Sequence, residues 1–316
     1  MVDLKGIVDG AMEIAVVPSF TDVGYRVRRS LFEWQDLSTL RMDGRVVVLT
    51  GATSGLGLAT SHLLAGMGAR LVLIVRDGEK GERLAAELGP HARVVVADLS
   101  DLASVRRAVG GLLRSEERID VLVNNAGALL PGRQRTAVGH EMTFATMVLG
   151  PFVLTNGLVP LLERSERGRV INVASGGMYL ERLHLDDLMM EREPYRGSVA
   201  YARAKRAQVL LTQDWARRLR ERGIVVHAMH PGWADTPGVE ASLPTFRKVL
   251  GPFLRTPEQG ADTIVWLAAS QEAASSTGRF WLDRSPRPID RLPWTRATIE
   301  EREALWAACE RLAAED

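Results

Sequence analysis

The 316-residue sequence contains one cysteine, Cys309, and only 4 Lys among its 40 Lys and Arg residues. A single cysteine excludes an internal disulfide and any metal site built from several cysteines, and it is typical of the reducing cytoplasm, where we expect this protein. The 6 His are scattered without a His-x-x-x-His pair, so we predict no metal site. No run of Lys and Arg exceeds two residues and the net charge is +1, which argues against a nucleic-acid partner.

Long apolar runs are also missing by inspection. None approaches the roughly 18 uncharged apolar residues that mark a membrane-spanning helix, so we expect no transmembrane segment. The apolar stretch 14–17 is preceded by Asp3, Asp9 and Glu13, which is the wrong charge for a secretory signal. With 46% hydrophobic and 25% charged residues, the composition is that of a globular protein with a sizeable core.

From position 45 onward, short apolar runs alternate with helical stretches. Strands are predicted at 45–50, 70–75, 93–97, 119–123, 169–174 and 224–230, and helices near 56–67, 79–88, 101–116, 139–164 and 199–222. Nearly continuous Val, Ile and Leu runs are typical of strands buried on both faces of a parallel sheet. The order predicts an α/β fold, a single Rossmann-type doubly wound parallel sheet of about seven strands flanked by helices.

Two segments lie outside this alternation. Residues 1–42, here called the leader, contain a predicted amphipathic helix around 22–34 that carries Arg26, Arg28 and Arg29. Residues 286–316 form a C-terminal extension with a predicted helix from 295 to 314, which Thr298 and Glu301 would open as a capping box. We expect both to pack on one catalytic domain at 43–285, since neither is long enough for a core of its own.

A glycine-rich loop, residues 50–57, follows the first predicted strand and opens a helix. Its spacing is Gly-x-x-x-Gly-x-Gly, at Gly51, Gly55 and Gly57. Glycines allow a tight turn and close approach to a pyrophosphate, which the amides of a helix N-terminus then bind. No Lys-Ser/Thr follows, so the loop is not that of a nucleoside triphosphatase.

The end of the second predicted strand bears on the choice of cofactor. Arg76 follows Val75 there, and a guanidinium at this position pairs with a 2′-phosphate, helped by hydroxyls of Thr53 or Ser54. This predicts NADP(H), with NAD(H) possible. The alternative is that Arg76 begins an exposed loop while Asp77 binds the ribose.

Tyr201 and Lys205 are four residues apart, which places both on one face of a helix. An ammonium beside a phenol favours the phenolate, so we expect it to lower the pKa of Tyr201 from about 10. A tyrosine of lowered pKa serves as a proton donor or acceptor near neutral pH.

Taken with motifs after the later strands, the chain resembles the short-chain dehydrogenase/reductase family over about residues 43–285. The further motifs are Asp98-Leu99, Asn124-Asn125-Ala126-Gly127, Ser175 at the end of 169–174, and Pro231-Gly232 with Thr236. Within the family, the stretches 175–178 and 19–25 resemble the retinol-dehydrogenase-like reductases and the "member 12" branch.

The resemblance implies site roles. It makes Ser175, Tyr201 and Lys205 the catalytic residues, with Ser175 holding the substrate oxygen and Lys205 also bonding the nicotinamide ribose. The residues implied to bind the cofactor are Gly51, Thr53, Ser54, Gly55, Leu56, Gly57, Arg76, Asp98, Leu99, Asn125, Ala126, Gly127, Tyr201, Lys205, Pro231, Gly232 and Thr236. It also implies a homodimer or homotetramer that pairs the helix carrying Tyr201 and the following helix across a twofold, a packing that the leader and tail could block.

One position departs from the family pattern. Met147 stands where the family has an Asn whose backbone contact holds a water in the proton path from the lysine. Methionine has no donor and only a weak acceptor, so another group positions that water or proton resupply is slower. Asn156 is nine residues away, on about the opposite face of a helix.

These residues predict an oxidoreductase that interconverts a ketone or aldehyde and an alcohol. The resemblance implies that residues 176–198 and 237–256 form the walls of the substrate site. Their apolar side chains suit a lipophilic small molecule, or else bury a dimer contact or pack on the leader. The alternative functions are a catalytically weakened NADP-binding sensor or scaffold, suggested by Met147, and an epimerase or dehydratase. The apolar side chains of 176–198 and 237–256 are Met178, Leu180, Leu183, Leu188, Met189, Met190, Leu243, Phe246, Val249, Leu250, Phe253 and Leu254.

Overall fold

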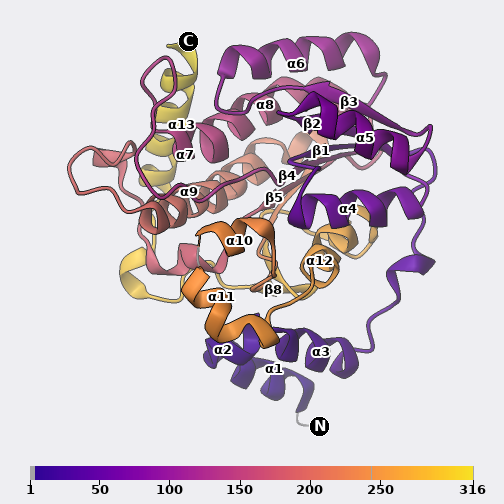
Figure 1. Ribbon diagram of the computed structural model, residues 1–316, viewed down its shortest axis with the longest axis vertical. Helices are drawn as coiled ribbons and strands as arrows, with labels where there is room; N and C mark the ends of the chain where they lie inside the picture. The colour runs from indigo at the N-terminus through magenta and orange to yellow at the C-terminus, as the bar shows by residue number, and fades with distance from the viewer. Residues whose placement is uncertain (1–3, 243, 316) are drawn as a thin grey trace.

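One mostly parallel sheet organises the structure, a computed structural model that describes residues 4–242 and 244–315. Its eight strands lie in the order β3-β2-β1-β4-β5-β6-β7-β8, with only β8 antiparallel (Figure 1). The predicted doubly wound fold is confirmed. The strands are β1 (Val46–Thr50), β2 (Arg70–Val75), β3 (Ala92–Val96), β4 (Val121–Asn124), β5 (Arg169–Val173), β6 (Val225–Met229), β7 (Phe280–Leu282) and β8 (Ser285–Arg287).

The last two strands were not named from the sequence. Each has three residues, too few for a run or an alternation of apolar positions to stand out. Tertiary pairing decides them: β7 adds in parallel to β6, and β8 turns back on β7.

Helices cover both faces of the sheet (Figure 1). In β1, Val46 and Val48 belong to the core cluster that contains residues of α6, α8, α9 and α13, while Val47 and Leu49 belong to the cluster that contains residues of α4, α5 and α12. Helix α12 was not predicted. The helices are α4 (Gly55–Gly66), α5 (Gly78–Leu88), α6 (Leu102–Ser115), α7 (Met142–Phe144), α8 (Gly150–Leu162), α9 (Gly197–Arg218), α10 (Pro237–Ser242), α11 (Pro244–Leu250), α12 (Pro257–Ala269) and α13 (Ile299–Ala314).

The stretch Met142–Leu162 corrects the expectation about long apolar runs. It consists of α7, the π-helical segment Ala145–Leu149, and α8, and it is long and apolar enough to cross a membrane. However, 72% of its apolar window is buried inside the protein, as in a core helix. The inspection missed it because Thr and Asn residues interrupt the apolar run without adding charge.

The leader forms three helices: α1 (Leu4–Ile14), α2 (Val16–Phe20) and α3 (Asp22–Leu31). Only α3 was predicted, and its Arg28 is fully buried instead of lying on the surface. The guanidinium of Arg28 pairs with Asp9 at 2.6 Å, Glu13 at 2.9 Å and Asp283 at 2.7 Å. The pair with Asp283 joins the leader to the turn between β7 and β8, and the other two hold α1 against α3.

The C-terminal helix α13 begins with the predicted capping box, which is confirmed: Thr298 accepts from the amide of Glu301, and Glu301 accepts from that of Thr298. Its Trp306 packs edge-on against Phe152 of α8 at 4.9 Å and Trp215 of α9 at 5.7 Å between ring centroids. The tail therefore covers part of the helix that carries Tyr201.

Candidate active site

The glycine loop lies at the carboxyl end of β1, where the chain order reverses between β1 and β4. Gly51 and Gly55 have φ of +67° and +51°, the left-handed region that favours glycine. A Cβ on Gly57 would collide with the carbonyl of Gly51, so no larger residue fits there. Ser54 is the N-cap of α4 yet makes no side-chain cap bond, so its hydroxyl and the first amides of α4 suit a bound phosphate.

Asn125 ties this loop to the end of β4. Its backbone N–H donates to the hydroxyl of Thr50 at 2.9 Å, and its side-chain amide donates to the carbonyls of Thr50 at 2.9 Å and Gly51 at 3.3 Å. The amide of Ala126 donates to the same Thr50 hydroxyl at 3.0 Å. Thr50 thus helps to hold the glycine loop in shape. The sequence analysis treated it only as the start of the loop.

Arg76 and Asp77 lie at the carboxyl end of β2. Both are exposed, but Asp77 is the N-cap of α5 and accepts from the amide of Lys80 at 3.0 Å. Within the described residues, Arg76 has no hydrogen bond or ion pair. The carboxylate is therefore engaged locally, while the guanidinium is available to an anion.

Asp98 and Leu99 follow β3. One carboxylate oxygen of Asp98 accepts from both the amide and the hydroxyl of Ser100, at 2.8 and 2.7 Å. Leu99 is buried, and its carbonyl lies so close to Gly150 that a Cβ there would collide with it. These contacts fix the acid at the edge of the sheet.

Ser175, Tyr201 and Lys205 come together at the carboxyl end of β5. Ser175 caps the short helix Gly176–Leu180, and its hydroxyl accepts from the amide of Gly177 at 3.3 Å. The Nζ of Lys205 lies 5.7 Å from the centroid of the Tyr201 ring. The predicted catalytic residues thus share one region beside the glycine loop.

The pKa values correct one expectation. Burial raises the pKa of Tyr201, and an interaction with the Ser175 hydroxyl opposes this only in part. Burial also lowers the pKa of Lys205 to about 7, so near neutral pH the amine carries a full charge only part of the time. Loss of hydration dominates both groups, and the lysine does not lower the pKa of the phenol as the sequence suggested.

Lys205 is held by two acceptors that the sequence analysis did not identify. Its Nζ donates to the carbonyl of Val173 at 2.6 Å and to Oε1 of Gln208 at 3.2 Å. Gln208 is buried one turn further along α9, and its Nε2 has no protein partner among the described residues. The three-residue spacing from Lys205 was the available signal.

Met147 lies in the π-helical segment and is fully buried. A Cβ on Gly127 would meet its sulfur at 2.9 Å and the Nζ of Lys205 at 3.6 Å, so both groups border Gly127. Because Pro151 has no N–H, the Met147 carbonyl cannot make the ordinary bond to the residue four positions on. Asn156 lies elsewhere and accepts from Trp215 Nε1 at 2.8 Å.

The loop 231–236 packs against both the glycine loop and the leader. Thr236 lies against Gly55, where a Cβ would approach its side chain to 3.2 Å. The amide of Trp233 donates to the carbonyl of Phe20 at 2.7 Å. The buried Arg255 donates to the carbonyl of Pro231 at 3.2 Å and leaves no space for a side chain at Gly232. The leader therefore helps to position this candidate cofactor loop.

The predicted apolar walls are only partly available to a substrate. Met178, Met190 and Leu254 are buried, and Met178 packs in a cluster with Phe20 of the leader, as the leader-packing alternative anticipated. Leu183, Leu188 and Met189 pack against the core, Phe246 against Trp233, and Leu250 is half-buried. Leu243 lies outside the described residues. Exposed side chains remain at Leu180, Val249 and Phe253.

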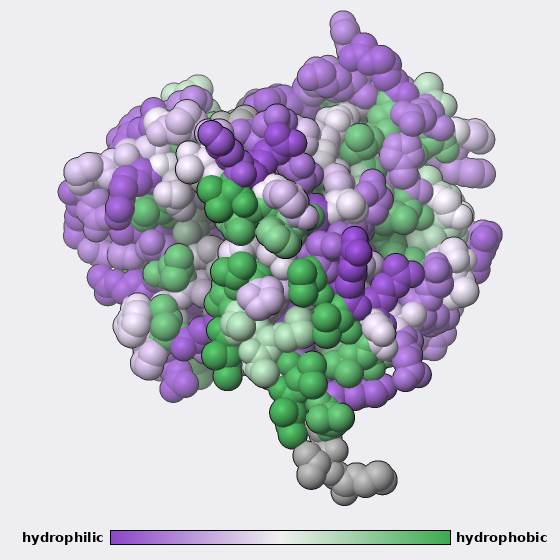
Figure 2. All heavy atoms as spheres, turned by 60° about the horizontal axis from the view of Figure 1, so that its bottom comes forward, coloured by the Kyte–Doolittle hydropathy of each residue, from purple (hydrophilic) through white to green (hydrophobic). Residues whose placement is uncertain are grey.

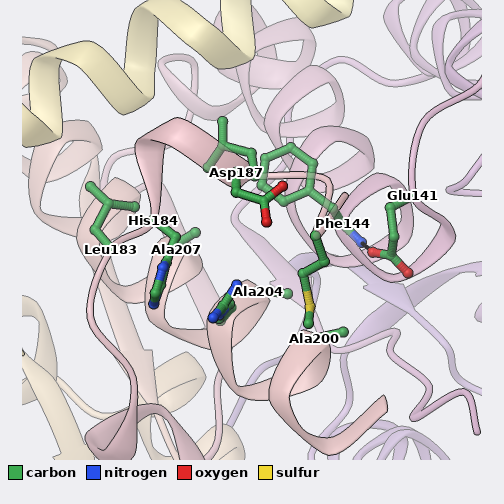
Figure 3. A pocket seen from close by; sticks show the side chains of 11 residues that line it. Glu141, Phe144, Leu183, His184, Asp187, Ala200, Ala204 and Ala207 are labelled. Atoms are coloured by element: carbon green, nitrogen blue, oxygen red, sulfur yellow. Dashed lines mark hydrogen bonds between the residues drawn. The ribbon is translucent and has the colours of Figure 1, made fainter. Parts of the chain in front are cut away.

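A small cavity lies beside α9 and does not include Ser175, Tyr201 or Lys205 (Figure 3). It is lined by Glu141, Phe144, His184 and Asp187, together with Ala200, Ala204 and Ala207 of α9. Its volume of about 20 Å³ holds roughly one water, so it is no substrate site.

A model of the short chain dehydrogenase family matches residues 45–245, which include every candidate catalytic residue. The chain belongs to this family. It is 40% identical over 273 residues to human "Dehydrogenase/reductase SDR family member 12", covering 84% of this chain and 85% of that protein. It is 36% identical over 267 residues to human "Retinol dehydrogenase 11", covering 82% and 83%.

Comparison with solved structures supports the same family. The 3-ketoacyl-(acyl-carrier-protein) reductase from Brucella melitensis, complexed with NADH, superposes with a TM-score of 0.61 at 28% identity and covers 75% of this chain and 96% of that chain. The resemblance to the family and to its retinol-dehydrogenase-like branch is confirmed, and the chain is an oxidoreductase.

Proposed function

We propose that this short-chain dehydrogenase interconverts a ketone or aldehyde and an alcohol on a lipophilic small molecule with NADP(H), using Tyr201 as the proton donor and acceptor. The observation that carries the proposal is that Tyr201, Lys205 and Ser175 lie together at the carboxyl edge of the sheet, beside the glycine loop. The name of the retinol dehydrogenase relative supports a lipophilic alcohol as one substrate class.

The residues divide the work in this proposal. A bound nicotinamide supplies or accepts the hydride. Tyr201 donates its hydroxyl proton to the substrate oxygen in reduction and takes it back in oxidation. Ser175 hydrogen-bonds the same oxygen and stabilises its developing charge.

Lys205 has one N–H left for the cofactor. An ammonium has three donors, and Val173 and Gln208 take two of them. The third is free for a ribose hydroxyl of the cofactor.

The other loops would hold the rest of the cofactor. The glycine loop and the start of α4 cradle the pyrophosphate, Asp98 and Leu99 border the adenine, and Asn125, Ala126 and Gly127 line the cleft. Pro231, Gly232 and Thr236 meet the nicotinamide carboxamide. The preference for NADP(H) rests on Arg76, because Asp77 is already occupied as the cap of α5.

The function is tested together with its cofactor preference. With a panel of long-chain aldehydes and ketones, we expect the reduced-nicotinamide absorbance to fall about tenfold faster with NADPH than with NADH, since a charge-assisted hydrogen bond contributes roughly 1.5–3 kcal/mol. Arg76→Ala should remove this preference, and Arg83→Ala, which changes an exposed arginine on α5, should keep it. An unchanged preference in Arg76→Ala would reject the role of this arginine.

A sensor or scaffold is the second candidate, favoured by the buried Met147 beside Lys205. It predicts tight NADPH binding without turnover of any carbonyl in the panel. The backbone carbonyl of Met147 favours an active enzyme. The Asn that the family has at this position holds the water of the proton path through its backbone, and methionine keeps that carbonyl.

Gln208 offers a test of the lysine. In Gln208→Glu, a carboxylate beside Lys205 raises the pKa of the amine above its value of about 7. Activity that needs the ammonium falls as pH rises through this pKa, so the alkaline fall in kcat/KM should move to higher pH in Gln208→Glu and to lower pH in Gln208→Leu.

The control is Gln213→Leu on the same helix, where Gln213 bonds Arg302 instead. It should leave the pH profile in place. Identical profiles for Gln208→Glu, Gln208→Leu and the wild type would show that Gln208 does not position Lys205.

Assembly and location remain predictions. A homodimer or homotetramer stays a prediction, as does pairing through α9, part of which is covered by α13. The single Cys309 is buried, and burial raises its thiol pKa to about 12, in keeping with an inert thiol in a cytoplasmic protein.

A further inference from the structure

Phe20, the last residue of α2, points away from the outer surface of the leader. Figure 2 shows hydrophobic side chains gathered on the side of the molecule that carries the leader, and Val17 of α2 exposes 50% of its surface there. Phe20 exposes only 3% and belongs to a core cluster with Ala174 and Met178, on either side of Ser175. One residue of the leader is therefore buried within the catalytic domain.

The ring of Phe20 contacts the residues that follow two neighbouring strands. It lies against Gly176, directly after Ser175, where a Cβ would come within 2.6 Å of Cε2 of the ring. It also packs edge-on against His230, which follows β6, with 4.4 Å between the ring centroids. Since β5 and β6 pair in parallel, this side chain touches the start of two loops at the same edge of the sheet.

His230 connects this contact to the candidate cofactor loop. Its Nδ1 accepts from the backbone amide of Gly232 at 3.2 Å, so in the neutral ring the proton lies on Nε2. Burial holds the pKa of His230 well below its ordinary 6.5 and keeps the ring neutral. Within the described part of the chain, Nε2 has no hydrogen-bond partner. The aromatic side chains around the imidazole, including Phe20, therefore set its orientation and with it the turn at Gly232.

The backbone of Phe20 contacts the same loop. Its carbonyl accepts from the amide of Trp233 at 2.7 Å, and a Cβ on Gly232 would meet this carbonyl oxygen at 2.7 Å. The rings of Phe20 and Trp233 pack edge-on with 5.6 Å between their centroids. Phe20 thus determines the place of this loop through both its backbone and its side chain.

Buried arginines hold Phe20 in position. The last carbonyls of a helix have no partner within that helix. At the end of α2, the Ser19 carbonyl accepts from Arg28 at 3.1 Å and from Arg255 at 2.9 Å. The Thr21 carbonyl accepts from Arg255 at 3.1 Å, and both arginines are buried. These bonds leave Phe20 little freedom to move away from the two loops.

We propose that Phe20 is a positioning residue of the active site, which sets the distance between the loop after Ser175 and the cofactor loop 231–236. A smaller side chain would leave a void between the two loops, and their groups would shift relative to one another. A small displacement is enough to misalign a nicotinamide with the groups around it. The role of loop 231–236 rests on the proposed function, whereas the contacts of Phe20 do not.

The test compares each dinucleotide with the fragment that lacks its nicotinamide. In Phe20→Leu, we expect the Kd of NADP⁺ to rise about tenfold, because hydrogen bonds to the nicotinamide are misaligned. The Kd of 2′-phospho-ADP-ribose should stay within about twofold of the wild type, since the glycine loop and α4 hold the pyrophosphate. Isothermal titration calorimetry measures both, and NAD⁺ with ADP-ribose gives the same comparison for a protein that prefers NAD⁺.

Phe152→Leu is the matched control for lost stability. Phe152 also exposes 3% of its surface, but it lies in α8, in a core cluster that does not contain Phe20. Val17→Ser, on the outer side of α2, controls for a change in the surface of the leader. Both should keep the wild-type ratio of the two affinities, although Phe152→Leu should lower the melting temperature as Phe20→Leu does.

Gly176 gives a second test, of the direct contact. Gly176→Ala places a methyl group against the ring of Phe20 and should weaken NADP⁺ binding by pushing the ring towards loop 231–236. The shorter side chain of Phe20→Leu relieves this collision. The fold-loss of affinity in the double variant should therefore be smaller than the product of the two single losses.

A Phe20→Leu variant that keeps the wild-type ratio of affinities overturns the proposal. An equal change of that ratio in Phe152→Leu also overturns it, because the effect would then be one of stability. A wild type that binds neither dinucleotide would overturn this proposal and the proposed function together. These titrations measure no turnover, so a protein that binds NADP⁺ as expected but reduces no carbonyl would reject the proposed reaction alone.

Discussion

Tyr201→Phe is expected to lower kcat by about 10³-fold, within the range of roughly 10²–10⁴ that a positioned acid or base supplies. The substitution removes one oxygen, and the ring and its contacts in α9 remain. Without the hydroxyl, the substrate oxygen loses the proton donor that the proposed mechanism gives it, so the alcohol forms slowly. Single-turnover absorbance of NADPH with a carbonyl that the wild type reduces measures the effect.

Cofactor affinity separates this chemical role from a structural one. Tyr201→Phe and Ser175→Ala should bind NADPH nearly as the wild type does, because the glycine loop and α4 hold the pyrophosphate without them. Near-normal turnover by Tyr201→Phe would refute the mechanism and favour the sensor.

Asp283→Asn is expected to destabilise the fold by about 3–5 kcal/mol, the usual cost of breaking a buried ion pair from one side. Asp283 accepts from Arg28 at 2.7 Å and from Arg255 at 2.5 Å, and all three side chains are buried. It is the only carboxylate bonded to Arg255 in the described residues. Asn tolerates the φ of +55° at this position, so the loss of charge is the main change.

The pH dependence follows from the direction of the pKa shift. Burial alone would raise the pKa of Asp283, but the Arg255 and Arg28 guanidiniums outweigh it and hold the pKa below the ordinary 3.8. The stabilisation is therefore complete above about pH 4 and is lost as pH falls further. In denaturant unfolding, the difference between wild type and Asp283→Asn should be constant at neutral pH and shrink below pH 4.

Asp186→Asn is the control, since its ion pair with Arg192 is exposed on both sides and should contribute less than about 1 kcal/mol. Equal stabilities of Asp283→Asn and Asp186→Asn would show that the buried network does not hold the leader in place.

Some of the site was readable from local pattern. Glycines 51, 55 and 57 between a strand and a helix, and Tyr201 and Lys205 one turn apart, stand out as candidate site residues through their spacing, and the structure brings them to one edge of the sheet. The strands were readable because β1 to β6 form apolar runs, although the runs in 119–123 and 224–230 are longer than the strands that form.

Other features depended on residues far apart in the chain. Gln208 was missed because its three-residue spacing from Lys205 allows a contact but does not show that the side chain turns towards the amine. The rise in the pKa of Tyr201 was missed because burial is a property of the folded site and outweighs a charge inferred from spacing.

The sequence by itself determined the α/β architecture, the position of the glycine loop and the family, because these follow from periodicity and from motifs a few residues long. Only the tertiary structure decided that Arg28 is a buried anchor, that β7 and β8 extend the sheet, and that the acids of α1 face inward while its apolar residues face out. The physical reason is that burial, ion pairing across more than 200 residues and strand addition are set by which elements meet in space, which neighbouring residues do not encode.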